Sequence, residues 1–320
     1  MKTLPTKTLA IRQGAEEVLA RPATEDDWPG IVEMHFTAPD MPWARPPEEM
    51  SPEERAEYGG PWMSIETLKP YYAVYVERGS PILVAEDNSG RIVANIDLWL
   101  ADEPEPVGRN AFVEIVQEDA EYLGSGLENA FLGYAAEIAR VFGYEALDGS
   151  FGIGGLSDDY SAKRAMGFRI WDEHDRLEIA CNPGPIADMV DLAAAGEAIQ
   201  DLVVLGRWAP TEYVWLLGRA GEPDEHRFGV QAAGQRCVIH GQQVKPAGTE
   251  GRPEATFYLP ADRRHDAALV GELCRIYSAF GARLGLDSFD CWVPSAVTDG
   301  LSGIEVKSAR YAGTCLRMRL

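Results

Sequence analysis

Two glycines, Gly124 and Gly126, stand one residue apart in the stretch EYLGSGLENAF of this 320-residue chain. They follow an apolar run that predicts a strand (residues 111–117) and precede a segment with helical periodicity (residues 127–142). A strand that turns through glycine into a helix points several backbone N–H groups one way, at the positive end of the helix dipole. Glycine leaves room there for an anion, because it has no Cβ and accepts left-handed backbone angles. An isolated pair of glycines would favour the alternative, a turn that needs glycine for geometry alone; the position of this pair is what raises the case for a phosphate-binding loop.

Four acidic residues surround this loop: Glu118, Asp119, Glu121 and Glu128. Two unit charges about 7 Å apart in water repel by only about 0.6 kcal/mol. Acids that point outward would therefore weaken the binding of an anion without abolishing it, whereas acids that point inward would prevent it. The direction of these side chains therefore decides whether the loop can bind an anion.

The rest of the first 180 residues predicts alternating strands and helices. Thr24 is a candidate N-cap for a helix whose apolar face includes Trp28 and Ile31. Residues 38–62 combine prolines and glutamates, which indicates a loop and a short acidic helix. The remaining predicted elements are a hairpin (82–100) with a turn at 87–90, a strand after the glycine helix (146–151), a short helix that ends at Gly167, and a strand before residue 181.

Residues 222–320 repeat the order of residues 82–180. The spacing between matching glycines is nearly constant, since Gly234 follows Gly90 by 144 residues and Gly285 follows Gly143 by 142. The second copy keeps the strand–loop–helix order, but Asp266 stands where the first copy has Gly124. We therefore predict two domains, residues 1–185 and 186–320, of which the second has a degenerate loop.

The segment from Val116 to Leu127 resembles the phosphate-binding motif of the GNAT superfamily of N-acetyltransferases, in which a strand valine precedes Arg/Gln-x-x-Gly-x-Gly/Ala. Here Glu121 replaces the first motif residue. The opening RPATEDDWPGI, the helix 127–142 and the Ala-Met-Gly-Phe ending at 168 are also similar to the family. The likeness covers about residues 19–180 and, more faintly, the second copy. It implies an α/β (α+β) protein of two GNAT-like domains, each a mixed, mostly antiparallel sheet flanked by helices.

The resemblance also implies acetyl-CoA as co-substrate, without a metal. Its pantetheine arm would lie between the strands 111–117 and 146–151, and a backbone N–H near Ile115 or Val116 would polarise the thioester carbonyl. The loop residues that would bind the pyrophosphate are Glu121, Tyr122, Leu123, Gly124, Ser125, Gly126 and Leu127. In the second copy, a side chain at Asp266 predicts that no acyl-CoA binds, which leaves a structural role beside the acceptor groove.

Two residues are candidates for proton transfer in a direct, ternary-complex reaction. Glu114, on the fourth strand of the family pattern, is the candidate base; the alternative is a strand carboxylate that faces solvent or is satisfied by a hydrogen bond. The family often uses a tyrosine as the leaving-group acid, at the position that Lys163 occupies here. Tyr160, one helical turn earlier, is the candidate acid, and a packed structural tyrosine is the alternative.

Family analogy places the acceptor, a primary amine on a small molecule or peptide, beside the segment after the first helix. Trp43 and Asp97 are the candidate contacts, through cation–π attraction and charge. The alternative is a solvated acidic helix with aromatic residues packed beneath it. A second function class stays open as well: a catalytically inactive GNAT-like module that binds a cationic ligand or a protein partner.

Composition limits the partners further. Acidic residues outnumber basic ones by 51 to 29, a net charge of −22, which opposes binding to nucleic acid or to an anionic membrane surface. The five cysteines are far apart, without the spacing of a zinc site or a disulfide framework. No stretch approaches about 18 uninterrupted apolar residues, and the N-terminus lacks a leader pattern, so we expect a cytoplasmic protein.

Overall fold

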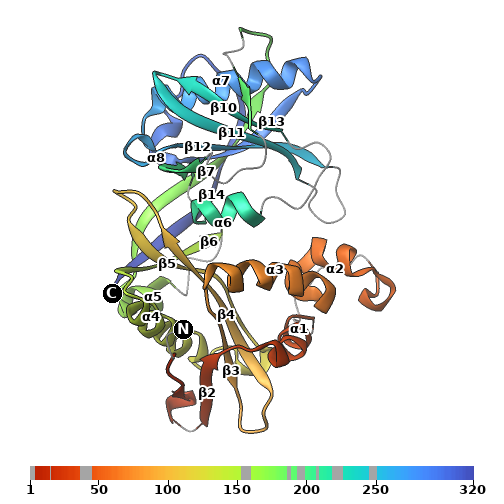
Figure 1. Cartoon of the computed structure of the whole chain (residues 1–320), viewed down its shortest axis with the longest axis vertical. Helices are drawn as coiled ribbons and strands as arrows, with labels where there is room; N and C mark the ends of the chain where they lie inside the picture. Colours follow the sequence, from red (N-terminus) through yellow and green to blue (C-terminus); the bar gives the residue numbers. More distant parts are fainter. Residues whose placement is uncertain are drawn as a thin grey trace.

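A computed structural model gives the fold of the chain and describes residues 4–14, 16–36, 45–152, 160–185, 189–192, 199–206, 209–217, 226–244 and 251–320. The described strands form one sheet in the order β1-β2-β3-β4-β5-β6-β14-β7-β13-β12-β11-β10-β8, with β9 paired to β12 (Figure 1). Among the strands that the structure describes, only the β5–β6 and β12–β13 pairs are parallel. The predicted fold class, a mixed and mostly antiparallel sheet flanked by helices, is confirmed.

The first half contains most of the predicted elements. The glycine helix begins at Leu127 and ends at Phe142, and the hairpin turns at Asp87 to Gly90, as the sequence predicts. The bounds are β1 (Lys7–Ile11), β2 (Glu16–Pro22), α1 (Trp28–Phe36), α2 (Pro52–Gly59), α3 (Ile65–Arg78), β3 (Ile82–Glu86), β4 (Ile92–Asp102), β5 (Arg109–Glu118), α4 (Leu127–Phe142), β6 (Ala146–Gly152), α5 (Tyr160–Met166) and β7 (Arg169–Ala180).

The sequence did not predict β1 and α3. Strand β1 is five residues long and pairs with β2 alone, so little in its composition marks it. Helix α3 contains Pro70, which ordinarily argues against a helix. It is nevertheless capped by Ser64, whose hydroxyl accepts from the Thr67 amide at 3.2 Å, and it ends at Gly79 with φ +67°.

The second half repeats the hairpin–strand–helix–strand order. Its elements are β8 (Val190–Asp191), β9 (Leu202–Val204), α6 (Thr211–Leu217), β10 (His226–Ala232), β11 (Gln235–Val244), β12 (Arg252–Pro260), α7 (Ala267–Arg283), β13 (Ser288–Pro294), α8 (Ser295–Thr298) and β14 (Val306–Arg319). Among all described helices, none is long and apolar enough to cross a bilayer.

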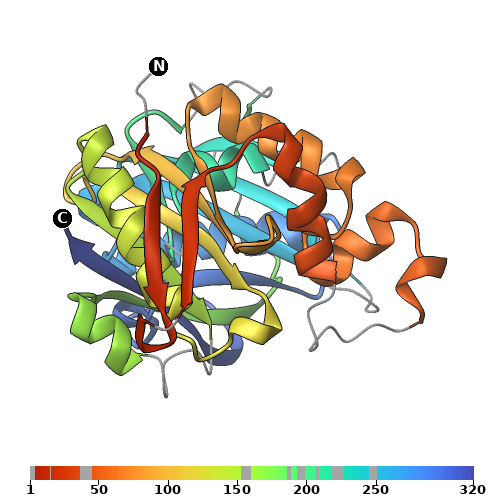
Figure 2. The ribbon, with the colours of Figure 1, turned by 90° about the horizontal axis from the view of Figure 1, so that it is seen from below.

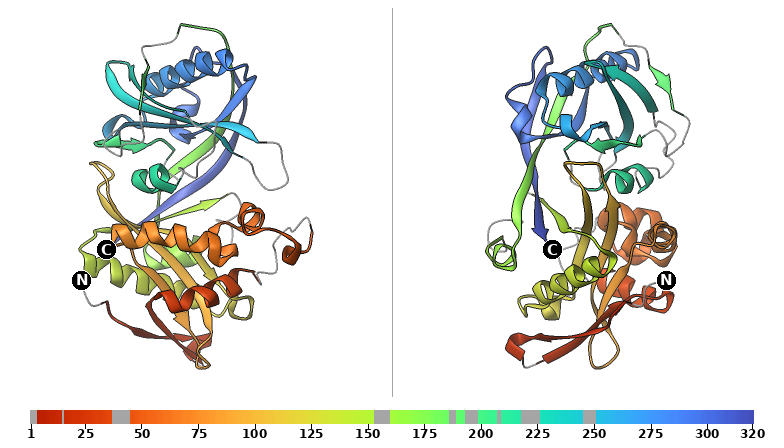
Figure 3. Two further views of the ribbon diagram at one scale, coloured as in Figure 1. Left: turned by 45° about the vertical axis from the view of Figure 1, so that its right-hand side comes forward. Right: turned by 60° about the vertical axis from the view of Figure 1, so that its left-hand side comes forward.

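The final strands of the two copies are exchanged. Strand β14, at the C-terminus, pairs with β6 of the first copy from Gly313 to Arg319, and β7 of the first copy pairs with β13 of the second from His174 to Ala180. β14 and β7 also pair with each other, so the two long strands run from one half into the other (Figures 1 and 3). The division at residue 185 stays a prediction, and the sheet continues through both halves.

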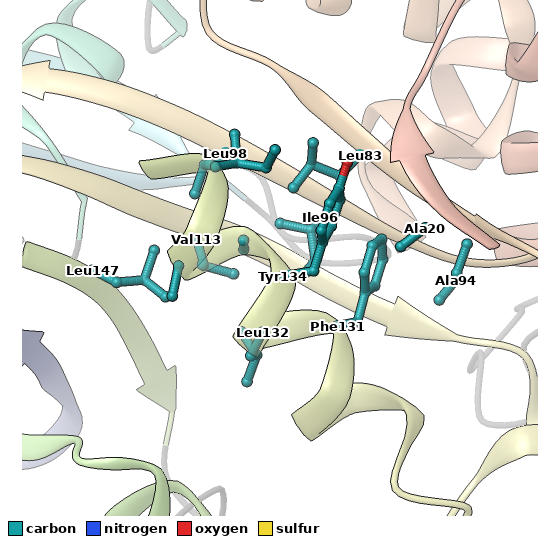
Figure 4. Close-up of a cluster of buried hydrophobic side chains, with 14 of the residues drawn as sticks. Ala20, Leu83, Ala94, Ile96, Leu98, Val113, Phe131, Leu132, Tyr134 and Leu147 are labelled. Atoms are coloured by element: carbon teal, nitrogen blue, oxygen red, sulfur yellow. The ribbon is translucent and has the colours of Figure 1, made fainter. Parts of the chain in front are cut away.

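Each face of the first-half sheet has its own core. On one face, α4 places Phe131 and Tyr134 against Leu83, Ile96 and Val113 of the strands (Figure 4). On the other face lie α1 and α3, and Figure 2 shows them on the side of the sheet opposite α4. This second face also receives α6 from the second half, so the two halves meet here as well as along the paired strands.

Candidate functional site

Strand β5 has a bulge at Glu114. Asp97 of β4 pairs with Ile115 and Leu98 pairs with Val113, which leaves Glu114 as an extra residue. Val113 belongs to the core under α4, whereas Ile115 packs on the opposite face, and Glu114 interacts there with tyrosines of α3 and α6. The bulge thus turns two consecutive side chains to one face, as bulges do beside many active sites.

The bulge lies where β5 and β6 separate. These parallel strands pair only from Ala111 to Val113 with Leu147 to Gly149. Among the described strands, none pairs with this edge of β5 beyond Val113, so Glu114, Ile115 and Val116 border the opening. Such an opening suits an extended ligand arm, and the predicted roles of the backbone at Ile115 and Val116 depend on it.

Burial raises the pKa of the partly buried Glu114 carboxyl to about 7, and a hydrogen bond from Tyr213 of α6 partly offsets this effect. A carboxylic acid with a pKa near neutrality is suited to accept a proton from an amine at physiological pH. The role of Glu114 as a base stays a prediction.

Asp97 lies fully buried on the same face. Its carboxylate accepts hydrogen bonds from Trp62 Nε1 at 2.8 Å, the Tyr72 hydroxyl at 2.9 Å and Asn95 Nδ2 at 3.1 Å. Burial raises its pKa to about 7, and these donors lower it in part. His35 extends the network: its Nε2 lies 2.7 Å from Asn95 Oδ1, and its ring stacks on Trp62.

With three donors, Asp97 already has the hydrogen bonds that a buried carboxylate needs. These contacts support a role in orienting the aromatic residues of α3 and its preceding turn. Direct contact of Asp97 with an acceptor stays a prediction. Trp43, the other predicted contact, lies outside the described residues.

In the glycine loop, Gly124 has φ +72° and Gly126 has φ +85°, angles that other residues rarely adopt. No atom lies within 4 Å of the position that a Cβ would take on either glycine, so the space above the loop is open. Gly126 is the N-cap of α4 and offers no side chain to its amides. The Ser125 hydroxyl accepts from the Leu127 amide at 3.1 Å.

The β1–β2 turn braces this loop. The Arg12 amide donates to the Ser125 carbonyl at 2.9 Å, and the Arg12 guanidinium donates to the Glu121 carbonyl at 2.6 Å. The same guanidinium lies over the ring of the buried Tyr122, while Leu123 is exposed. The loop backbone is therefore held in place by a segment more than a hundred residues away.

The loop acids point in different directions. Glu121 and Asp119 both pair with Arg91, at 2.7 and 3.0 Å, and Glu128 pairs with the buried Lys163 at 2.9 Å. These three acids are thus each paired with a cation, and Arg91 is shared between two of them.

Glu118 instead turns towards the loop. Its Oε2 accepts from the Glu128 amide at 3.2 Å, and the Gly124 amide also donates to this carboxylate. Burial, and then repulsion from Glu128, raises the pKa of Glu118 to about 6. One protein carboxylate thus already uses amides that an anionic ligand would use.

Tyr160 begins α5 and packs, partly buried, against the core on the α4 side. Glu114 faces the opposite side, towards α3 and α6. Lys163, which holds the family's tyrosine position, has its side chain buried in the ion pair with Glu128. The predicted acid role of Tyr160 remains a prediction.

In the second half, Asp266 is the N-cap of α7, the position that Gly126 holds before α4, whereas the sequence spacing matches Asp266 with Gly124. Its Oδ1 accepts from the Ala268 amide at 3.0 Å and the Leu269 amide at 3.1 Å, and Arg263 Nε donates to Oδ2 at 3.0 Å. The Asp266 side chain therefore occupies this helix end, as the sequence predicts. Among the described residues, no three His, Cys, Asp or Glu side chains are grouped to hold a metal ion.

Sequence reasoning missed two members of the site, Tyr71 and Tyr213, whose hydroxyls lie 3.2 Å apart. Tyr71 is on α3, which the sequence did not predict, and Tyr213 is about a hundred residues beyond Glu114 on a seven-residue helix. The alternation of tyrosines in PYYAVY was the available signal, because a helix places Tyr71 and Tyr75 one turn apart.

Two solved structures of similar fold are named N-acetyltransferases. A GCN5-related N-acetyltransferase from Kribbella flavida is similar over 95% of this chain and 71% of its own, with 13% identity and a TM-score of 0.57. One from Anabaena variabilis ATCC 29413 is similar over 93% of this chain and 71% of its own, with 10% identity and a TM-score of 0.58. The chain has the fold of GCN5-related N-acetyltransferases. No protein-family model matches its sequence, and no curated protein matches it significantly.

Proposed function

We propose that this protein is an acyl-CoA-dependent N-acetyltransferase that transfers an acetyl group from acetyl-CoA to a primary amine on a small molecule or peptide. The observation that carries the proposal is the Glu114 carboxyl, which has a pKa of about 7 and projects from the bulge where β5 and β6 separate. The shared fold of the two acetyltransferases supports the reaction class.

In the proposed step, the neutral amine nitrogen attacks the thioester carbonyl carbon. The C–N bond forms, the C–S bond breaks, and Glu114 accepts the proton that the amine loses. The leaving thiolate takes a proton from Tyr160, the residue that we assign to this role. The net charge of −22 favours the approach of ammonium-bearing acceptors over anionic ones.

The glycine loop is the proposed pyrophosphate site. The open space over Gly124 and Gly126 fits an anion, whereas the carboxylate of Glu118 competes for the same amides. Binding therefore requires that Glu118 be displaced or protonated.

The test combines isothermal titration with a turnover assay. We expect micromolar binding of acetyl-CoA, and acetylation of at least one member of a panel of primary amines, detected by mass spectrometry. Glu114→Gln should retain acetyl-CoA binding and lose kcat by about 100-fold or more, because a general base contributes on the order of 10²–10⁴. Glu77→Gln, at an exposed position on α3, is the matched control and should retain activity.

The second candidate is a catalytically inactive module that binds a cationic ligand or a protein partner. The observation that favours it is the Glu118 carboxylate inside the loop. Absence of heat and of a thermal shift with acetyl-CoA or CoA, for the wild type and for Glu118→Gln alike, would favour this candidate and reject the transferase.

A further inference from the structure

Helix α6 of the second half is docked on the first half through buried polar contacts. Glu103, in the loop after β4, accepts from the Thr211 amide at 2.7 Å and from the Thr211 hydroxyl at 2.9 Å. The Thr211 hydroxyl also accepts from the Val204 amide at 2.9 Å. A carboxylate at the start of a helix stabilises it, so a first-half residue orders this second-half helix.

Docking of α6 places Tyr213 against the aromatic residues of the first half. Its ring meets Trp99 edge-on with centroids 5.4 Å apart and Tyr75 edge-on at 6.4 Å. These contacts leave the buried side chain little freedom. Its hydroxyl lies 3.2 Å from that of Tyr71 and forms a hydrogen bond with Glu114.

We infer that Tyr213 is a positioning residue, through which the second half orients the Glu114 carboxylate. The inference rests on the proposed function for its catalytic meaning. A donor that binds an ionised carboxylate stabilises the charge, and here the Tyr213 hydroxyl counteracts part of the effect of burial on the pKa of Glu114. Through Tyr213, the second half thereby acts on the proposed base of the first half.

Four titratable groups face Glu114 from the packed elements: Tyr71 and Tyr75 of α3, Asp97 of β4 and Tyr213 of α6. Burial raises the pKa of each tyrosine well above its usual value, so all three stay neutral while Glu114 titrates. Asp97 has a pKa of about 7 itself and repels the charge on Glu114. Among the described residues, Tyr213 donates the hydrogen bond that lowers the pKa of Glu114 and so acts against this repulsion.

The direct test is a ¹³C NMR titration of the glutamate side-chain carboxyls in the full-length protein, with the Glu114 signal assigned from Glu114→Gln. In Tyr213→Phe we expect the Glu114 titration to move to higher pH by about one unit, because a hydrogen bond to a charged group is lost. Tyr277→Phe removes a buried hydroxyl from the second-half core and is the matched control. Thr211→Val, which loosens α6, should cause a smaller shift in the same direction.

Turnover is a second readout. The acidic limb of the kcat/KM profile should move in Tyr213→Phe by the same amount as the NMR titration, with acetyl-CoA affinity unchanged. An unshifted Glu114 titration in both folded variants would overturn the inference. Lack of turnover by the wild type, with the NMR shift present, would instead reject the proposed function and leave the control of Glu114 by Tyr213 standing.

Discussion

The two halves differ most where each central helix begins. In the first half, Gly126 precedes α4, and the carboxylate that reaches the loop amides comes from Glu118, at the end of the preceding strand. In the second half, Asp266 is itself the N-cap of α7 and binds amides two and three residues ahead. In both halves, backbone amides at the start of the central helix thus donate to a carboxylate. In the first half this carboxylate comes from the preceding strand, and in the second it comes from the N-cap residue itself.

This difference shows how the same fold can leave the start of its central helix accessible to a ligand or occupy it with a side chain. The Asp266 side chain is fixed by its own backbone position, and Arg263 holds the pKa of its carboxyl below the usual value. Glu118 reaches over from a strand and has a raised pKa of about 6. An anion could therefore displace Glu118 by a side-chain rotation, whereas displacing Asp266 would uncap a helix.

The largest effect should follow from closing the first-half loop. In Gly124→Glu/Gly126→Glu, two side chains enter the open space at positive φ, which strains the backbone and adds two charges. We expect acetyl-CoA affinity to fall by about 100-fold or more, on the order of two 1.4 kcal/mol steps. Isothermal titration measures the loss.

A matched double variant of the second half serves as the control. Gly234 and Gly285 also have positive φ, +73° and +78°, with no atom within 4 Å of a Cβ position. Gly234→Glu/Gly285→Glu imposes comparable strain and the same charge away from the loop, and it should leave affinity within about threefold of the wild type. Equal losses in both double variants would mean that the glycine loop is not the binding site.

A smaller effect, in the opposite direction, should follow from Glu118→Gln. A neutral amide competes less for the loop N–H groups and repels an anion less, so affinity for acetyl-CoA should rise by about three- to tenfold at pH 7.5. In the wild type the affinity should increase as the pH falls through about 6, since protonation of Glu118 removes its charge. The variant should lack that part of the pH dependence.

Glu121→Gln tests whether this gain is specific. Glu121 is exposed and paired with Arg91, so its change should alter affinity little. The pyrophosphate assignment would be contradicted by a variant at position 118 that binds acetyl-CoA no better than the wild type at any pH between 5 and 8.

The smallest effect should follow from Asp266→Ala. Loss of the α7 cap should lower the free energy of unfolding by about 1 kcal/mol, the usual magnitude for an N-cap. Urea denaturation measures this change. Because the second half lacks the glycines, uncapping it should create no new acetyl-CoA site. A second binding event in the titration would show that the two halves differ less than their loops indicate.

Local patterns predicted much of the first half. The two glycines and the periodicity of residues 127–142 predicted the loop and helix α4, because a positive φ and an apolar stripe leave direct marks in sequence. The Asp87–Gly90 turn predicted the hairpin for the same reason. Helix α3 left a weaker mark, because Pro70 interrupts its pattern while Ser64 and the packing of Tyr72 and Tyr75 stabilise it.

The candidate site was predicted only in part. Glu114 came from its place on the strand, but the bulge that turns it towards α3 depends on the register between β4 and β5, which side chains on both strands decide. Tyr213 left no local signal, since its relation to Glu114 depends on the docking of α6. The inward direction of Glu118 likewise depends on its neighbours: Arg91 and Lys163 pair with the other three acids.

The sequence by itself determined the repeated element order, the glycine loop of the first half and the capped helix end of the second, because each depends on residues within one or two turns of chain. The tertiary structure alone decided the exchange of β7 and β14, the contact of Tyr213 with Glu114 and the direction of each loop acid. These features join segments far apart in the chain, and their free energies depend on burial and pairing that exist only after the halves have packed together.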